Sequence, residues 1–264
     1  MEWLRPLGQT GLMVSALGLG TVKLGRNSGV KYPADFSLPS DGEARQLLAL
    51  ARDLGINLID TAPAYGSSEE RLGTLLQGQR NDWVICSKVG EEFDGSQSHY
   101  DFTPKHVQAS VERSLQRLRC DYLDIVLVHS DGSDLDIVQR HGTLAALADL
   151  KQAGKLRSFG LSGKTVAGGL AALGQSDLLM VTYNLGERDQ EPLLDACNDQ
   201  GKGVLIKKAL ASGHLDSLPE HGDPVLASMK FVLGHAATTS AIIGTITPDH
   251  LRSNVSAARQ ALAG

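Results

Sequence analysis

The sequence predicts an α/β fold and, within that class, a (β/α)8 TIM barrel made by one domain over residues 1–264. Eight apolar runs of about five residues alternate with helical patterns, and each run is continuous rather than alternating in hydrophobicity. Such runs are typical of parallel strands that helices cover on both faces. An open doubly wound sheet is the competing architecture, and the lack of a GxGxxG motif after the first run disfavours it.

A short β-hairpin is expected before the barrel. In the segment LRPLGQTGLMVSAL, Gly8 and Gly11 mark a turn between two strand-forming halves. We expect this hairpin to close the barrel bottom, opposite the loops that form active sites in this fold. The barrel strands are then expected at residues 14–20, 56–60, 83–88, 122–129, 157–162, 178–184, 203–208 and 240–244.

Four of the intervening helices have recognisable boundaries. The first begins with Ser40 and Glu43 at the spacing of a capping box and ends at Gly55. Proline just inside a helix start and glycine just after a helix end mark others. The four helices are expected at 40–55, 103–119, 144–155 and 247–263.

Composition narrows the class of protein. The net charge of −5 gives no basic footprint for nucleic acid or an anionic membrane surface, and no apolar run approaches the roughly 18 residues of a membrane span. The start of the chain shows no secretory signal pattern. Cys86, Cys120 and Cys197 fit neither a disulfide framework nor a zinc site, and Cys86 reads as a core residue. We therefore expect a cytoplasmic monomer that acts on a small molecule without a metal.

Four polar side chains are expected to meet at the mouth of the barrel. Asp60, Lys88 and His129 end the second, third and fourth predicted strands, and Tyr65 lies in the loop after Asp60. Each residue alone has an ordinary structural explanation, such as a helix cap, a solvated strand end or a buried histidine. The carboxyl ends of the strands converge in this fold, so the four together indicate a catalytic cluster.

The chemistry of such a cluster follows from the residue types. A free tyrosine hydroxyl has a pKa of about 10, and a nearby ammonium group lowers that pKa. Lys88 can supply this charge, and Asp60 can hold Lys88 in place and charged. His129 can orient a carbonyl oxygen or assist proton transfer. The four residues suit protonation of an oxygen on which charge develops, as hydride addition to a carbonyl requires.

At these residues the sequence resembles the aldo-keto reductase family almost end to end. The segments that carry the resemblance are RPLGQTGLMVSALGLGT, NLIDTAPAYGSSEERLG, ICSKVG and SLQRLRCDYLDIVLVHS. The resemblance implies a barrel that binds a nicotinamide cofactor, usually NADPH, and reduces aldehydes or ketones or oxidises sugars. It implies that Tyr65 is the general acid, that Lys88 lowers its pKa, that Asp60 pairs with Lys88, and that His129 orients the carbonyl.

The resemblance also implies a cofactor site, which departs from the family pattern in places. Gly163 and Met180 stand where an Asn and a Gln often hold the nicotinamide amide, and Lys207 stands where a Tyr often stacks on the ring. His250 replaces an Arg that often holds the 2′-phosphate, so NADPH is expected and NADH remains possible. The implied cofactor contacts are Gly20, Thr21, Val22, Ser162, Met180, Lys207, Leu210, Ser212, Thr245, His250 and Asn254.

The substrate pocket is expected to form from loops 26–40 and 91–103 and the carboxy-terminal end. The second loop can contribute Phe93, His99, Tyr100 or Phe102, and the alternative is a solvated surface loop in which one or two aromatic residues hold the loop in place. A short carboxy-terminal end suggests an open pocket of broad specificity. Two other functions stay open at this point: a slow-turnover NADP-binding regulatory subunit, and an isomerase or aldolase in which Lys88 forms a Schiff base.

Overall fold

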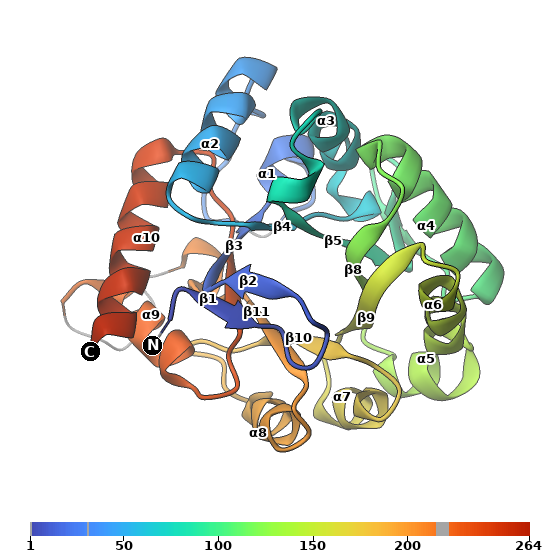
Figure 1. Cartoon of the computed structure of the whole chain (residues 1–264). Coiled ribbons are helices and arrows are strands. Elements are labelled where there is room, and N and C mark those ends of the chain that lie inside the picture. The colour runs from blue at the N-terminus through green and yellow to red at the C-terminus, as the bar shows by residue number, and fades with distance from the viewer. Residues whose placement is uncertain (1, 31, 215–221) are drawn as a thin grey trace.

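A computed structural model of the chain describes residues 2–30, 32–214 and 222–264. Eight parallel strands close into a barrel in the order β3, β4, β5, β8, β9, β10, β11 and β12, and β12 pairs back onto β3 (Figure 1). The predicted (β/α)8 barrel is confirmed. The barrel strands are β3 (Leu17–Gly20), β4 (Leu58–Asp60), β5 (Val84–Val89), β8 (Leu123–His129), β9 (Leu156–Ser162), β10 (Leu178–Thr182), β11 (Gly203–Lys207) and β12 (Ser240–Ile243).

Helices surround the barrel on its outer side (Figure 1). The capping box at Ser40 and Glu43 is present, with hydrogen bonds in both directions. Within the described residues, no helix combines the length and apolar character needed to cross a bilayer. The α-helices are α1 (Val22–Gly25), α2 (Asp41–Asp53), α3 (Ser68–Leu75), α4 (Pro104–Leu118), α5 (Asp134–Arg140), α6 (Thr143–Gln152), α7 (Val166–Leu173), α8 (Glu191–Asp199), α9 (Pro224–Gly234) and α10 (Pro248–Ala263), and the short 3-10 helices are η1 (Pro63–Tyr65), η2 (Arg80–Asp82) and η3 (Ala211–Gly213).

The amino-terminal hairpin closes the barrel bottom, as predicted. Strands β1 (Leu4–Pro6) and β2 (Met13–Ser15) pair in antiparallel register, and the hairpin lies across the barrel in Figure 1. Its turn presses on the barrel, because a Cβ at Gly8 would lie 2.4 Å from the amide nitrogen of Gly203 at the start of β11. The single strand predicted over 14–20 is wrong in one respect. The strand is interrupted at Ala16, between β2 of the hairpin and β3 of the barrel.

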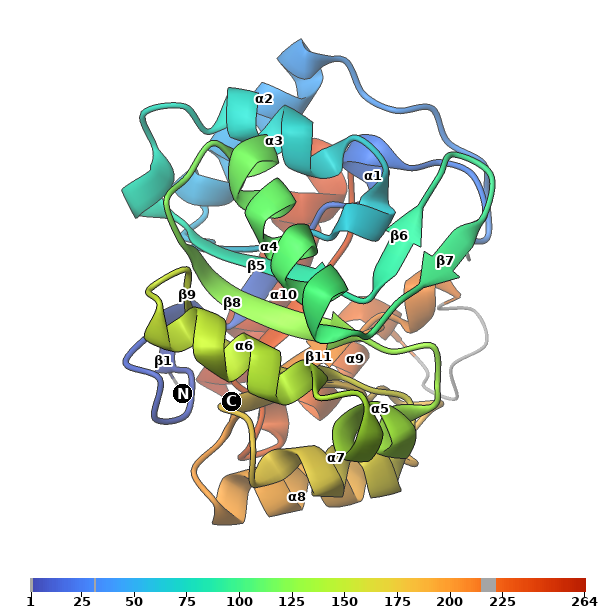
Figure 2. The same cartoon turned by 90° about the vertical axis from the view of Figure 1, so that its right-hand side faces the viewer.

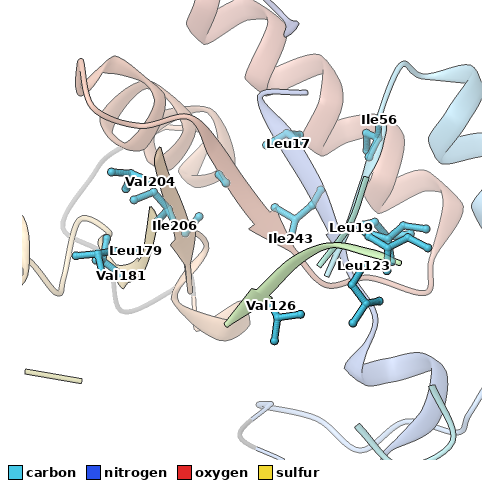
Figure 3. Close-up of a cluster of buried hydrophobic side chains, with 14 of the residues drawn as sticks. Leu17, Leu19, Ile56, Leu123, Val126, Leu179, Val181, Val204, Ile206 and Ile243 are labelled. Carbon is cyan, nitrogen blue, oxygen red and sulfur yellow. The ribbon is translucent and has the colours of Figure 1, made fainter. Parts of the chain in front are cut away.

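The barrel strands sort their side chains into two apolar cores. Alternate residues point to opposite faces, so one set fills the barrel and the other packs against the helices. The outer set is the larger, and Figure 3 shows part of it as side chains on β3, β8, β10, β11 and β12. The inner set joins hairpin residues to the side chains that fill the barrel. It comprises Leu7, Leu12, Val14, Leu58, Cys86, Ile125, Leu127, Leu178, Met180 and Leu205.

A second hairpin follows β5 where the sequence suggested only a loop over 91–103. Strands β6 (Glu91–Phe93) and β7 (Ser98–Tyr100) pair in antiparallel register and stand beside α1 in Figure 2. The strands EEF and SHY are short and polar, so they lack the apolar pattern by which the barrel strands are recognised. The hairpin matters for the site because Glu91, its first residue, reaches a catalytic candidate.

Candidate active site

The alternation of strand residues brings the predicted tetrad together. Leu58, Cys86 and Leu127 point into the barrel, so the residues two positions further along β4, β5 and β8 do the same. Those residues are Asp60, Lys88 and His129, the last inward-facing residue of each strand. With Tyr65 from η1 they line one cavity of about 130 Å³ at the carboxyl ends of the strands. The convergence expected from the sequence is therefore present in the fold.

Asp60 and Lys88 form a buried ion pair at the base of this cavity. The Lys88 Nζ donates to Asp60 Oδ1 at 2.6 Å and to the carbonyl oxygen of Thr61 at 2.9 Å. Burial lowers the pKa of Lys88, but the charge of Asp60, its hydrogen bond to Lys88 and the neighbouring Tyr65 and Cys86 together outweigh burial, and the pKa is raised overall. Lys88 is therefore held as an ammonium ion. A Schiff-base lysine needs a lowered pKa, so the aldolase alternative loses its support.

Tyr65 lies over this ion pair. Its hydroxyl donates to Asp60 Oδ2 at 3.4 Å, and Lys88 Nζ lies 4.6 Å from the centre of the Tyr65 ring. Burial and the charge of Asp60 raise the pKa of Tyr65, whereas Lys88 lowers it. The lowering that the sequence predicted is thus one contribution, and burial and Asp60 outweigh it. Tyr65 is therefore protonated at neutral pH in the resting enzyme, and the ammonium group of Lys88 lies beside it, where it can stabilise the phenolate that forms when the proton is transferred.

His129 reaches the cavity from the end of β8 with a carboxylate behind it. Its Nδ1 lies 2.8 Å from Glu91 Oε2, and its ring meets that of Tyr65 edge to face at 6.2 Å between centroids. Burial lowers the pKa of His129, Lys88 lowers it further, and Glu91 opposes both. His129 Nδ1 and Glu91 Oε2 lie within ion-pair distance but outside hydrogen-bond geometry, and a neutral imidazole at neutral pH with Nδ1 facing Glu91 is the expected resting form.

Sequence reasoning missed Glu91. It lies in a polar segment with no strand pattern, and only the β6–β7 hairpin turns it toward β8. Burial raises the pKa of Glu91, but the contact with His129, a hydrogen bond from Ser98 and the charge of Arg26 lower it overall to about 2. The carboxylate is therefore charged throughout the physiological pH range.

A groove runs from the catalytic cavity across the barrel mouth to the start of α10. It measures about 470 Å³ and shares Tyr32, Ile242 and Gly244 with the cavity, so the two are continuous. Of the eleven cofactor residues that the resemblance implied, five line the cavity and five the groove. The cavity residues are Gly20, Val22, Ser162, Met180 and Lys207, and the groove residues are Leu210, Ser212, Thr245, His250 and Asn254.

Thr21 is the exception, because it lines neither space. It is fully buried, and both its amide and its hydroxyl donate to the carbonyl oxygen of Asp60. Ser68 Oγ in turn donates to Thr21 Oγ1 at 2.8 Å. Thr21 therefore fixes the end of β4, where Asp60 lies. The groove also contains residues that the sequence did not single out, among them Lys23, Tyr32 and Lys208.

Lys207 enters the same cavity from the end of β11. Its Nζ donates to the carbonyl oxygen of Gly163 at 2.6 Å and to Ser162 Oγ at 3.1 Å. Burial and the charge of Lys208 lower the pKa of Lys207 to about 7. The amine of Lys207 thus lies where the family often has an aromatic ring. It lies near Gly163 and Met180, which stand where the family often has the Asn and Gln that bind the nicotinamide amide.

The four aromatic or histidine side chains expected to shape the substrate pocket lie elsewhere. Phe93 packs under Arg26, at 3.6 Å between the guanidinium carbon and the ring centre, and His99 pairs with the exposed Asp94. Phe102 is 5% exposed and belongs to the outer core, and Tyr100 lies beside it. None of the four lines the catalytic cavity as the described residues form it.

Comparisons with known proteins agree with this geometry. The model of the Aldo/keto reductase family matches residues 16–225. L-galactose dehydrogenase of Arabidopsis thaliana is 34% identical over 84% of this chain and 68% of its own length, and NADH-specific methylglyoxal reductase of Escherichia coli (strain K12) is 30% identical over 80% and 68%. A solved structure of an aldo-keto reductase from Pseudomonas aeruginosa is 55% identical, with a TM-score of 0.90 over 99% of this chain and 96% of that one.

Proposed function

The chain belongs to the aldo-keto reductase family and is an oxidoreductase, and from that premise we propose that it transfers hydride between NAD(P)H and the carbonyl carbon of a small aldehyde, ketone or aldose. One observation carries the proposal. Asp60, Tyr65, Lys88 and His129 line one cavity, with the Lys88 ammonium 2.6 Å from Asp60 and beneath the Tyr65 ring.

Each member of the tetrad has a part in the reaction. When bound, the reduced cofactor supplies the hydride. Tyr65 donates its hydroxyl proton to the substrate oxygen as negative charge develops there. Lys88 stabilises the phenolate that remains, and Asp60 holds Lys88 in position. In the oxidative direction the same phenolate accepts the proton of the alcohol, and His129 orients the substrate oxygen in both directions.

The groove supports binding of the cofactor by this chain. Lys23 and Lys208 provide cations along it, and the groove ends at the start of α10, where the helix dipole favours anions. Lys208, Ala211 and Ser212 have φ values of 56°, 47° and 56° in the loop after β11. Left-handed backbone costs about 1–3 kcal/mol for residues other than glycine and is typical of functional sites. Leu210 and Ser212 are the pyrophosphate contacts, and Thr245, His250 and Asn254 hold the adenosine end.

NADPH is the preferred cofactor in this proposal, and NADH is also accepted. The preference is supported by the resemblance to the family and by the cationic side chains of the groove. It is limited by His250, which is exposed and replaces the arginine that forms a bidentate clamp on the 2′-phosphate. A relative from Escherichia coli is named for NADH specificity, so the family accommodates both cofactors.

The substrate class is small and polar. Two relatives are named for L-galactose and for methylglyoxal, both small and polar, and the tetrad lies in a small cavity of about 130 Å³. We further propose that the enzyme is a cytoplasmic monomer. All three cysteines are free thiols, as in a reducing compartment, and the barrel closes within one chain.

The experiment that tests the proposal follows the loss of NADPH, and separately of NADH, by absorbance with 4-nitrobenzaldehyde. Tyr65→Phe removes the donated proton and is expected to lower kcat by about 10²- to 10⁴-fold, with cofactor binding retained. Tyr183→Phe is the matched control. Tyr183 is a buried tyrosine whose hydroxyl donates to Glu191 away from both spaces, so its variant should turn over like the wild type.

Two outcomes contradict the proposal in different ways. Equal turnover in wild type and Tyr65→Phe would remove Tyr65 from the reaction. Measurable binding of both cofactors with no turnover in the wild type would instead favour the slow-turnover regulatory subunit, which keeps the barrel and the cofactor site.

A further inference from the structure

Glu91 is the one carboxylate besides Asp60 that contacts a tetrad residue in the described part of the chain. The side chain of Glu91 is 12% exposed, and its Oε2 lies 2.8 Å from Nδ1 of His129. This contact leaves Nε2 as the ring nitrogen available to the cavity that His129 lines. The nitrogen that carries the proton in a histidine is set by the partner of the other nitrogen.

Glu91 is itself held from two sides. Ser98, on the other strand of the hairpin, donates its hydroxyl to Glu91 Oε1 at 2.6 Å. The guanidinium of Arg26 lies 3.9 Å from the same oxygen and donates to the carbonyl oxygen of Ala64, next to Tyr65. The carboxylate therefore joins the loop after β3, the loop after β4 and the β6–β7 hairpin at one point. A group fixed in this way can fix the ring that it contacts.

We propose that Glu91 is a positioning residue of the reaction, which holds His129 with Nδ1 toward itself and Nε2 toward the substrate oxygen. Nε2 of the neutral ring accepts a hydrogen bond from an alcohol hydroxyl, Nε2–H of the protonated ring donates one to a carbonyl oxygen, and Glu91 balances the charge of the protonated ring. The inference rests on the proposed role of His129 in the cavity. In the hydride transfer Glu91 makes and breaks no bond, and its effect passes through the imidazole. Carboxylates behind metal-bound histidines act in the same way on ring orientation and basicity.

A purely structural role for Glu91 predicts something different. If the carboxylate serves only to pin the hairpin through Ser98 and Arg26, its loss should change stability and leave the state of the His129 ring unaltered. The two roles are separated by a graded pair of variants. Glu91→Gln keeps an acceptor oxygen and removes the charge, whereas Glu91→Leu removes both.

The measurement is the protonation state of His129 in the protein without cofactor or substrate. Protein labelled with ¹⁵N in histidine is titrated by long-range ¹H–¹⁵N correlation spectra, and the His129 signals are assigned by their loss in His129→Gln. In the wild type we expect a neutral ring with its proton on Nδ1. Glu91→Gln should lower the pKa of His129 by about one unit, because Lys88 and Lys207 then act on the ring with no opposing carboxylate.

In Glu91→Leu no carboxylate favours the proton on Nδ1 of His129. Signals of a neutral ring protonated on Nε2 should therefore appear as well. In turnover it should lower kcat by about 10- to 100-fold, the range found when the carboxylate behind a metal-bound histidine is removed, with a smaller change in KM. Asp94→Asn is the matched control. Asp94 contacts His99 at 2.7 Å on the same hairpin but is exposed, so its removal should leave His129 and turnover unchanged.

The state of His129 decides the inference independently of turnover. An unchanged tautomer and pKa in Glu91→Leu would overturn it. Should Glu91→Leu fail to fold, the isosteric Glu91→Gln decides, and a His129 pKa equal to that of the wild type would overturn the inference. Loss of turnover in Tyr65→Phe tests the catalytic proposal alone, so the two can fail separately.

Discussion

Two lysines, one buried and one partly buried, enter the same cavity from opposite sides of the barrel, and their pKa values move in opposite directions. Lys88, on β5, donates to a carboxylate and to a carbonyl oxygen, and its pKa is raised. Lys207, on β11, donates to a hydroxyl and to a carbonyl oxygen, and its pKa falls to about 7. Both amines make two hydrogen bonds, so the difference lies in the charge of the acceptor.

This difference divides the mouth into two halves. In the half formed by β4, β5 and β8, acids accompany the bases: Asp60 contacts Lys88, and Glu91 contacts His129. In the half formed by β9, β10 and β11, the amine of Lys207 donates to neutral oxygens, and the repulsion of its charge by Lys208 and Lys164 is only partly offset by Asp134. The first half thus keeps a fixed charge for proton transfer, whereas the second offers an amine that titrates near neutral pH.

The largest effect is expected from breaking the paired lysine. Lys88→Met leaves Asp60 as an uncompensated charge whose side chain is only 5% exposed, and removal of one partner of a buried pair costs about 3–5 kcal/mol. We expect this loss in the free energy of unfolding measured by urea denaturation, together with loss of turnover.

The double variant Asp60→Asn/Lys88→Met sharpens this test. Removal of both charges leaves no buried ion, so the double variant should recover part of the lost stability while remaining inactive. A double variant less stable than Lys88→Met would show that the pair stabilises by its hydrogen bonds rather than by charge balance.

Lys207, whose hydrogen-bond acceptors are uncharged, should behave in the opposite way. The pKa of Lys207 is about 7 in the folded protein, and its ordinary value, which applies to the unfolded chain, is 10.5. Between these two pH values the lysine is protonated in the unfolded chain and neutral in the folded protein. The stability of the wild type should therefore rise with pH across this window. Below pH 7 both states are protonated, and the charge in the folded protein costs at most about 5 kcal/mol, less where water reaches the partly exposed side chain.

Lys207→Met removes this pH dependence. The variant should be more stable than the wild type near pH 6, and the difference should shrink as the pH approaches 10. Urea denaturation at pH 6, 8 and 10 measures it, with Lys105→Met as the control because Lys105 is exposed on α4, away from Lys207. A stability difference that stays constant over these pH values would mean that Lys207 does not titrate as inferred.

The smallest effect is expected at the far end of the cofactor half. His250→Arg restores a guanidinium where the groove meets α10, and a charge-assisted contact with the 2′-phosphate should tighten NADPH binding by about tenfold. NADH, which lacks that phosphate, should bind as before. Titration calorimetry with both cofactors checks the ratio, and equal gains for the two would place the arginine on the pyrophosphate instead.

The sequence by itself determined the barrel and the tetrad. Continuous apolar runs identified the strands, because a parallel strand is buried on both faces. Asp60, Lys88 and His129 could be recognised as one cluster, since a closed barrel brings the carboxyl ends of its strands together whatever their separation in the chain. The cofactor candidates came from the resemblance to the family instead, and ten of the eleven line the cavity or the groove.

Only the tertiary structure decided the environment of each group. Glu91 meets His129 because a short polar hairpin, invisible to hydrophobic periodicity, turns it toward β8. Thr21 supports Asp60 from behind instead of facing the cavity. The contrast between Lys88 and Lys207 also follows from neighbours on other strands. Residue type and strand position are local properties that the sequence records, whereas a pKa depends on the distances to charges and on the loss of water, which exist only once the chain has folded.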